Sequence, residues 1–285
     1  MNQAGETTIT EQNIEDFNKD GVVCLRRVLD DDWVDRMRGA VDRITENPGP
    51  MRESYYPDRP GDFFSEKFLW TVDEDFRSYA FESPVAAAVG RLMGTRRLNF
   101  FYDHLLVKEP GTDSATEWHQ DSNFWPFSGS QIATLWAPLD RATRDNGVLE
   151  FVPGSHLWHD RPMSRPTIFG DRDGKPQDVT DEGAGPVDDT PEQPDIQNNR
   201  DQFDIVSWDL DPGDALVFTG LTLHYASGNP TEGRRRGLAT RWLGDDIRFL
   251  RKKKMLKMIR DPGLTDGSRV DCDLFPVVWH ADKAA

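Results

Sequence analysis

The sequence predicts a mainly β protein with flanking helices, an α+β chain whose strands form a sandwich or a closed jelly roll. From residue 98 onward, short apolar stretches alternate with turns that contain Pro, Gly or Asn, which is typical of such folds. Before that point, the apolar side chains are mostly spaced as they are in helices. Hydrophobic residues make up 36% of the 285 positions and aromatic residues 11%, so the chain can build a large core.

The N-terminal part, residues 10–95, is expected to pack helices against the sheet. Thr10 is a good helix N-cap, and the helix that it begins ends at Asp20-Gly21. Residues 48–66 are rich in Pro, Gly and Tyr, which indicates a long connection that is a lid, a pocket wall or an ordinary surface loop. The other expected elements are a strand at residues 22–25, a helix from Asp30–Asp32 to the residue before Asn47, and a helix from Ser83-Pro84 to Gly94.

The jelly-roll core is expected over residues 98–250, with an irregular insertion at residues 158–202 that is rich in Asp, Gly, Pro, Gln and Asn. No repeat or second core is visible, so residues 1–285 are interpreted as a single domain. The expected strands cover residues 98–108, 119–125, 132–139, 148–152, 204–210, 215–219 and 238–243.

Charge and composition limit the possible partners. The formal net charge is −16, from 34 basic and 50 acidic side chains, which argues against nucleic acids and anionic membranes. No apolar run approaches the ~20 residues of a membrane span. Cys24 and Cys272 set no disulfide pattern, so a reducing cytoplasm is the expected compartment, with a monomer or homodimer as the working form. The basic run at residues 251–258 indicates a solvated helix or an interaction patch.

The strongest chemical signal is the pair His119 and Asp121. Residues 117–125 are expected to be extended, and residues two apart on a strand project to the same face. An imidazole and a carboxylate on one face are two of the three ligands of the 2-His-1-carboxylate triad of non-haem Fe(II). The pair alone is a weak signal, because a surface charge pair or a hydrogen-bonded core pair has the same pattern.

A third ligand is expected from a later strand of the same cavity, and His224 is the best candidate because it follows an expected strand and precedes a turn. His104, within a strand, is a weaker candidate that could point inward. Arg235 lies eleven residues after His224, between Arg234 and Arg236. Side chains alternate on a strand, so Arg235 shares a face with neither neighbour, and its planar guanidinium suits a carboxylate. A basic turn is the alternative interpretation of this arginine cluster.

Taken together, these residues resemble the Fe(II)- and 2-oxoglutarate-dependent dioxygenases, and most closely the phytanoyl-CoA dioxygenase family. The resemblance covers about residues 10–250 and implies a double-stranded β-helix, a jelly roll closed over the iron. It rests on IEDFNKDGVVCLRRVL, on LLVKEPG before WHQD, on Asp145-Asn146-Gly147 leading to FVPGSH, and on DPGDALVFTGLTLHYASGNP leading to RRRGLATRW.

The resemblance also implies roles for individual residues. His119, Asp121 and His224 would bind Fe(II), and Arg235 would bind the distal carboxylate of the co-substrate 2-oxoglutarate. Family members often carry Gly-Ser after the second His, whereas Tyr225-Ala226-Ser227 stands here, so no hydroxyl contact to 2-oxoglutarate is implied at that point. Further contacts are implied for Lys108, Thr134 and Trp136 with 2-oxoglutarate. Contacts with the substrate are implied for Tyr102, Phe124, Trp125 and Phe127, with core packing as the alternative role of each aromatic ring.

The expected activity is oxidation of a small molecule by O2, most simply hydroxylation, with release of succinate and CO2. Asp121 favours oxygen chemistry, because halogenating relatives carry a small residue at that position. The net charge and the acidic insertion favour a neutral or cationic free molecule over an acyl-CoA. The alternatives are a metal-binding cupin of another class, such as an isomerase or a ligand-binding module, and a catalytically inactive relative.

Overall fold

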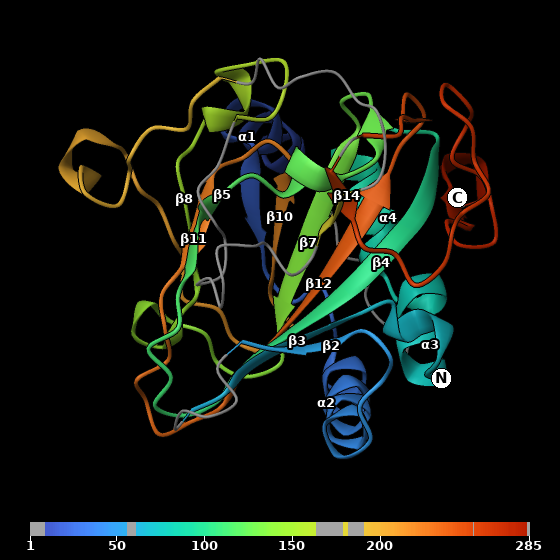
Figure 1. Ribbon diagram of the computed structural model, residues 1–285. Helices are drawn as coiled ribbons and strands as arrows, with labels where there is room; N and C mark the ends of the chain where they lie inside the picture. The colour runs from blue at the N-terminus through green and yellow to red at the C-terminus, as the bar shows by residue number, and fades with distance from the viewer. Residues whose placement is uncertain (1–8, 56–60, 164–178, 182–190, 253, 284–285) are drawn as a thin grey trace.

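A large antiparallel sheet and a small one face each other in the computed structural model, which describes residues 9–55, 61–163, 179–181, 191–252 and 254–283. The large sheet has eight strands in the order β1-β10-β7-β12-β4-β3-β2, and β15 also pairs with β4. Figure 1 shows the small sheet, β5-β11-β8, opposite the β10, β7 and β12 part of the large one. This arrangement confirms the predicted mainly β class.

The bounds of the strands show which predictions were accurate. The large sheet contains β1 Val22–Leu25, β2 Arg52–Ser54, β3 Phe63–Lys67, β4 Arg97–Lys108, β7 Ile132–Pro138, β10 Ala215–Thr219, β12 Arg235–Leu243 and β15 Val277–His280. The small sheet contains β5 Thr116–His119, β8 Leu149–Phe151 and β11 His224–Ala226. Two further pairs are β6 Phe127–Ser128 with β13 Arg248–Phe249, and β9 Val179–Asp181 with β14 Lys254–Leu256.

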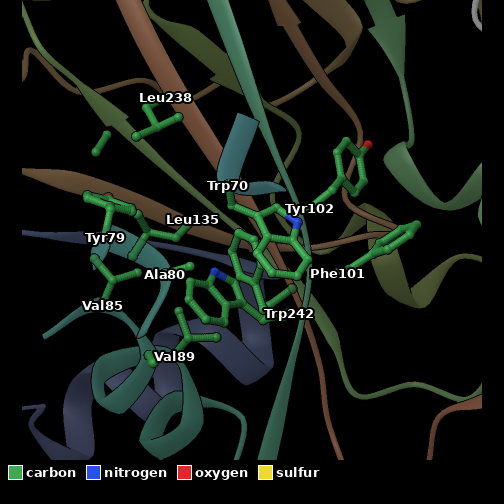
Figure 2. Packing of buried hydrophobic residues seen from close by; sticks show 14 of the residues in the cluster. Trp70, Tyr79, Ala80, Val85, Val89, Phe101, Tyr102, Leu135, Leu238 and Trp242 are labelled. Carbon is green, nitrogen blue, oxygen red and sulfur yellow. The ribbon is translucent and has the colours of Figure 1, made fainter. Parts of the chain in front are cut away.

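Helices pack on the face of the large sheet that is turned away from the small sheet. Thr10 caps α1 through its side chain, as the sequence predicts, and Gly21 ends that helix with a φ of +75°. Asp30 caps α2 in the same way. Figure 2 shows side chains of α3 and α4 beside Leu135 and Trp242 of the sheet. The helices are α1 Glu11–Asp20, α2 Asp31–Glu46, α3 Glu74–Glu82 and α4 Val85–Leu92. None of the helices in the described residues is both long and apolar enough to cross a membrane.

A β-bulge in β4 changes which of its side chains face the helices. Arg241 of β12 is opposite Tyr102, but the next residue of β12, Trp242, is opposite Phe100, so Phe101 is the additional residue. The rings of Phe101 and Tyr102 consequently lie together, with centroids 4.5 Å apart, away from the helix side chains in Figure 2. The bulge lets Phe100 pack against Trp242 while Tyr102 faces the space between the sheets.

Four predicted elements were wrong. The expected strand at residues 119–125 ends at His119, because the chain turns into the 3-10 helix η2 (Asp121–Phe124), where Ser122 hydrogen-bonds Gly220. The expected connection at residues 48–66 contains β2 and most of β3, since β3 is buried beside β4. Residues 204–210 form only isolated bridges, and residues 254–256 are a strand rather than a helix. Parts of the predicted insertion, residues 164–178 and 182–190, lie outside the described residues.

Candidate metal centre and active site

The three predicted metal ligands meet between the two sheets. His119 ends β5, Asp121 begins η2, and His224 begins β11, directly opposite His119 in the small sheet. The Oδ1 atom of Asp121 lies 3.6 Å from Nε2 of His119 and 3.9 Å from Nε2 of His224. One ligand atom from each residue lies within 4.8 Å of the other two, which suits a single metal ion.

Backbone carbonyls orient both imidazoles. Nδ1–H of His119 donates to the carbonyl of Glu117 at 2.7 Å, and Nδ1–H of His224 donates to the carbonyl of Thr222 at 2.9 Å. This arrangement fixes the tautomer that leaves the Nε2 lone pairs available for a metal. Burial, assisted by His119, also lowers the pKa of His224 to about 3, so its ring is neutral at pH 7.

The two oxygens of Asp121 have different surroundings. Oδ1 faces the imidazoles, whereas Oδ2 accepts hydrogen bonds from the Thr134 hydroxyl at 2.8 Å and from Nη2 of Arg241 at 3.4 Å. Burial alone would raise the pKa of Asp121, but the charge of Arg241 and the contacts with the imidazoles hold it well below its ordinary value. Asp121 is therefore an anion with one oxygen directed at the two imidazoles.

The buried arginine is the middle one of the three. Arg234 pairs with Glu109, and Arg236 pairs with Asp140, both at 2.8 Å. Arg235 is 2% exposed, and in the described part of the chain no carboxylate lies within ion-pair distance of it and nothing accepts from its Nε–H. Its guanidinium carbon lies 5.6 Å from the centre of the Trp136 ring, and burial lowers its pKa to about 10. The predicted alternation of faces is confirmed.

Lys108 is opposite Arg235 on β4 and is also buried. Its ammonium donates to the carbonyls of Ala226, at 3.2 Å, and Ser227. Burial, followed by the charge of Arg235, lowers the pKa of Lys108 well below its ordinary value. Lys108 is thus held at the Arg235 end of the site, although it is not among the residues that line the cavity.

These residues fit Fe(II) and 2-oxoglutarate. Two neutral imidazoles and one carboxylate are the donor set of the facial triad, which leaves coordination positions for further ligands. A buried guanidinium without a carboxylate partner is costly unless a ligand supplies one, and 2-oxoglutarate carries such a group at its distal end. The donor set therefore matches Fe(II), and the unpaired arginine matches the distal carboxylate of 2-oxoglutarate.

A cavity that encloses about 800 Å³, including the space at its mouth, connects these residues. Tyr102, Phe124 and Trp125, the predicted substrate contacts, all line it, as do Arg235 and Trp136. Thr134 is buried beside Asp121, and neither it nor Phe127 is part of the lining. The lining is completed by the triad and by His104, Leu106, Thr116, Leu149, Phe218, Ala226, Ala239, Arg241 and Leu256.

Sequence reasoning missed Arg241 and Leu256. The signal for Arg241 was present: it is six residues after Arg235 on the same strand, and an even spacing places two side chains on one face. Leu256 gave no usable signal, because it lies in the basic run that was interpreted as a helix or a surface patch.

Known proteins resemble this chain in sequence and in structure. A probable phytanoyl-CoA dioxygenase of Caenorhabditis elegans is 27% identical over 57% of this chain and 49% of its own length. The peroxisomal phytanoyl-CoA dioxygenase of Rattus norvegicus is 22% identical over 83% of this chain and 69% of its own length.

A crystal structure of the epimerase SnoN, in complex with Fe3+, α-ketoglutarate and nogalamycin RO, matches 94% of this chain and 98% of its own. Its TM-score is 0.72 and its sequence identity is 20%, which supports the jelly-roll fold. The profile of the phytanoyl-CoA dioxygenase family, PhyH, matches residues 17–237, more than three quarters of the sequence. The chain therefore belongs to the phytanoyl-CoA dioxygenase family and is an oxygenase that uses Fe(II), 2-oxoglutarate and O2.

Proposed function

We propose that this enzyme hydroxylates a small molecule, with conversion of 2-oxoglutarate to succinate and CO2, and that His119, Asp121 and His224 bind its iron. The observation that carries the proposal is the convergence of these side chains, from β5, η2 and β11, within 4.8 Å of one another. When bound together, iron, 2-oxoglutarate and O2 supply the oxidising power. The protein binds, orients and shields the reactants.

Arg235 binds the distal carboxylate of 2-oxoglutarate in this proposal, since it is the buried guanidinium that no carboxylate of the described chain neutralises. Trp136 forms the adjacent wall, and the position of Lys108 opposite Arg235 supports a role for its charge at the same end. Thr134 acts through Asp121, because its hydroxyl is bonded to Oδ2 of that carboxylate. This role differs from the direct contact with 2-oxoglutarate that the resemblance implied.

The substrate binds on the aromatic side of the cavity. Tyr102, Phe124 and Trp125 line it there, and Trp125 donates to the Tyr102 hydroxyl at 3.3 Å, which ties the two rings together. Aromatic walls exclude water from the reacting atoms, and water exclusion strengthens every charged contact in the site.

The proposal is tested by succinate formation across a panel of small molecules, with mass spectrometry of each product. A substrate that raises succinate output and gains one oxygen atom supports hydroxylation. A product that has lost two hydrogen atoms, or that is rearranged, would keep the assignment as an oxygenase but replace hydroxylation as the reaction type. Turnover of acyl-CoA esters but not of free molecules would overturn the proposal that the substrate is a free small molecule.

The alternative is a metal-binding cupin that is not an oxygenase. Such a protein has no use for a buried carboxylate-binding guanidinium, so Arg235 weighs against it. Binding of 2-oxoglutarate to the Fe(II)-loaded protein without oxygen separates the two, because only the oxygenase requires it.

The enzyme acts in a reducing cytoplasm as a monomer or homodimer, on neither nucleic acid nor membrane. The net charge of −16 and the two free cysteines support this part of the proposal. Light scattering on the purified chain measures the mass of the assembly, and a mass above that of a dimer would contradict it.

A further inference from the structure

A second buried arginine lies in the same cavity. Arg241 is 5% exposed and lines the cavity from β12, six residues after Arg235. The two Cα atoms are separated by roughly 20 Å of strand, from a rise of about 3.3 Å per residue. Arg235 is anchored beside Trp136 and Leu106, whereas Arg241 is anchored beside Asp121 and Tyr102. The two guanidinium groups therefore have different anchors in the cavity, and that of Arg241 lies beside the candidate metal position.

The contacts of Arg241 use little of its hydrogen-bonding capacity. Nη2 donates to Oδ2 of Asp121 at 3.4 Å, and the guanidinium carbon lies 4.9 Å from the centre of the Tyr102 ring. Nε and Nη1 are buried and find no acceptor in the described residues. A guanidinium has five N–H donors, and leaving a charged donor buried without an acceptor is unfavourable.

The charges of the assembled site leave Arg241 in excess. Fe(II) contributes two positive charges and Arg235 one, while Asp121 contributes one negative charge and 2-oxoglutarate two. These charges cancel. Arg241 adds one positive charge inside a cavity with aromatic walls, while Lys108 is buried at the Arg235 end and is outside the cavity lining. A buried net charge is costly in such surroundings, so the occupied site favours a substrate that carries one negative charge.

The surroundings of Arg241 define the rest of the ligand. Tyr102 lies against Arg241 and accepts a hydrogen bond from Trp125. Both rings line the cavity together with Leu256, which suits an apolar or aromatic body. Lys252 donates to the carbonyl of Ser122, next to Asp121, and so adds a positive charge near η2.

We propose that Arg241 binds a carboxylate of the primary substrate, which is a monoanionic small molecule with an apolar or aromatic body. The inference rests on the proposed function and specifies its substrate class. It reverses the expectation from composition, which favoured a neutral or cationic molecule. The net charge of the chain was a poor guide to the charge of the substrate, because the cavity is basic although the protein is acidic.

A role in positioning alone is the competing explanation, because Arg241 also holds Oδ2 of Asp121. Thr134 provides the matched control, since its hydroxyl holds the same oxygen at 2.8 Å but is not part of the cavity lining. Thr134→Val removes a hydrogen bond from Asp121 and leaves the charge of Arg241 in place. Any effect that arises through Asp121 is therefore shared by the two variants, and any effect of carboxylate binding is not.

The experiment uses the full chain loaded with Mn(II) and saturating 2-oxoglutarate without oxygen, so that no turnover occurs and Arg235 is occupied. Calorimetry measures the Kd of two matched pairs of probes: phenylacetate with phenylacetamide, and indole-3-acetate with indole-3-acetamide. Each pair differs in charge and hardly in shape. We expect the acid to bind about 10- to 100-fold more tightly than its amide, the range for hydrogen bonds to a charged group.

Arg241→Gln should reduce this preference to about one, Arg241→Lys should retain part of it, and Thr134→Val should leave it unchanged while weakening Mn(II) binding. An equal loss of preference in Arg241→Gln and Thr134→Val would overturn the inference, as would the absence of any acid preference in the wild-type protein. If the wild-type protein binds neither Mn(II) nor 2-oxoglutarate, the proposed function fails. If it binds both but prefers no acid, only the role of Arg241 fails.

Discussion

Each of the three side chains at the metal position is held by a second contact, so the site is built before a metal arrives. Glu117 and Thr222 hold the imidazoles through their carbonyls, and Thr134 holds Asp121. Such contacts fix the direction of the ligand atoms and raise metal affinity. Because the site is preorganised, removing one ligand should cost affinity without disturbing the others.

His119→Ala should weaken metal binding by at least about 100-fold, since loss of a supporting contact alone costs 10- to 100-fold. Equilibrium dialysis with Fe(II) under anaerobic conditions measures the affinity. His156→Ala serves as the control, because that ring bonds the carbonyl of Asn18 and does not line the cavity. Undiminished binding in His119→Ala would contradict the ligand assignment.

Arg235→Gln should weaken 2-oxoglutarate binding by about 2–4 kcal/mol, the cost of losing a buried charged pair. Arg234→Gln is the matched control, because that neighbour pairs with Glu109 and its side chain is 36% exposed. Calorimetric titration of the Mn(II)-loaded variants gives both values. Equal losses in the two variants would mean that the arginine run acts through its overall charge.

The residues that meet at the candidate site could largely be predicted from the sequence, but their supporting contacts could not. His119, Asp121, His224 and Arg235 have spacings that reflect strand geometry and the family pattern, so the sequence reveals them. The acceptors for the imidazoles are backbone carbonyls, which every residue carries, so no side chain marks them. The bond from Thr134 to Asp121 depends on how two distant segments pack.

At the scale of single elements, β12 organises the cavity. It faces the cavity with Arg235, Ala239 and Arg241, and with Gly237 between them. A Cβ atom on Gly237 would lie 2.6 Å from Nε1 of Trp136, so only glycine leaves room for the indole on the neighbouring strand. This close approach sets the position of the wall beside Arg235.

Gly237→Ala should displace Trp136, lower stability by about 1–3 kcal/mol as overpacking does, and weaken 2-oxoglutarate binding. Gly233→Ala is the control, because nothing lies within 4 Å of the Cβ that it would gain. Urea unfolding measures the stability of each variant, and calorimetry measures the affinity. A Gly237→Ala protein with wild-type stability and unchanged affinity for 2-oxoglutarate would contradict the role given to the close approach of Gly237 and Trp136.

The strand β3, which lies between β2 and β4, carries a buried carboxyl group that should make stability depend on pH. Glu66 is 0% exposed, and burial raises its pKa from 4.5 to about 7, against the charge of Arg52 on the paired strand. The neutral form is therefore favoured in the folded state, and its contribution is complete below pH 4.5 and is lost as the pH rises through 7. The loss amounts to about 3 kcal/mol, at about 1.4 kcal/mol per pKa unit.

Glu66→Gln should therefore stabilise the protein at about pH 8 and have little effect at about pH 4, because glutamine cannot ionise. Urea unfolding of the variant and the wild-type protein at both pH values measures the difference. Glu46→Gln at the exposed end of α2 is the control and should show no such dependence. The same stability change at both pH values would exclude ionisation of Glu66 as the cause.

The elements that sequence reasoning missed depend on tertiary pairing. β3 forms because β4 offers an edge beside it, and β2 forms on β3. The bulge at Phe101 depends on the register of β12 against β4. Local sequence does not record either partner. Helix caps such as Thr10 and Asp30 act within three residues of themselves, so α1 and α2 were predictable.

At the scale of the whole molecule, the site joins segments that are far apart in sequence. The small sheet supplies the histidines, η2 supplies Asp121, and the large sheet supplies Arg235. The two-sheet architecture was predictable from the pattern of short strands, whereas the pairing of β15 with β4 was not. The single-domain organisation over residues 1–285 stays a prediction.

Mn(II) with 2-oxoglutarate should raise the melting temperature, because ligands that bind only the folded chain stabilise it by mass action. A hundredfold excess over Kd corresponds to about 2.7 kcal/mol. Differential scanning calorimetry measures the shift, and His224→Ala should abolish the part that depends on the metal. A wild-type protein with no shift would lack a formed site in solution.

The two buried arginines on one strand also suggest how substrate length could be selected. Along a strand, the side chains on one face recur every two residues, or roughly every 7 Å. Moving the cation of Arg241 by two residues, with Ala239→Arg and Arg241→Ala together, would shift the recognised acid away from Asp121 and toward Arg235. The altered enzyme would then present a different carbon of its substrate for oxidation, without any change to the metal ligands.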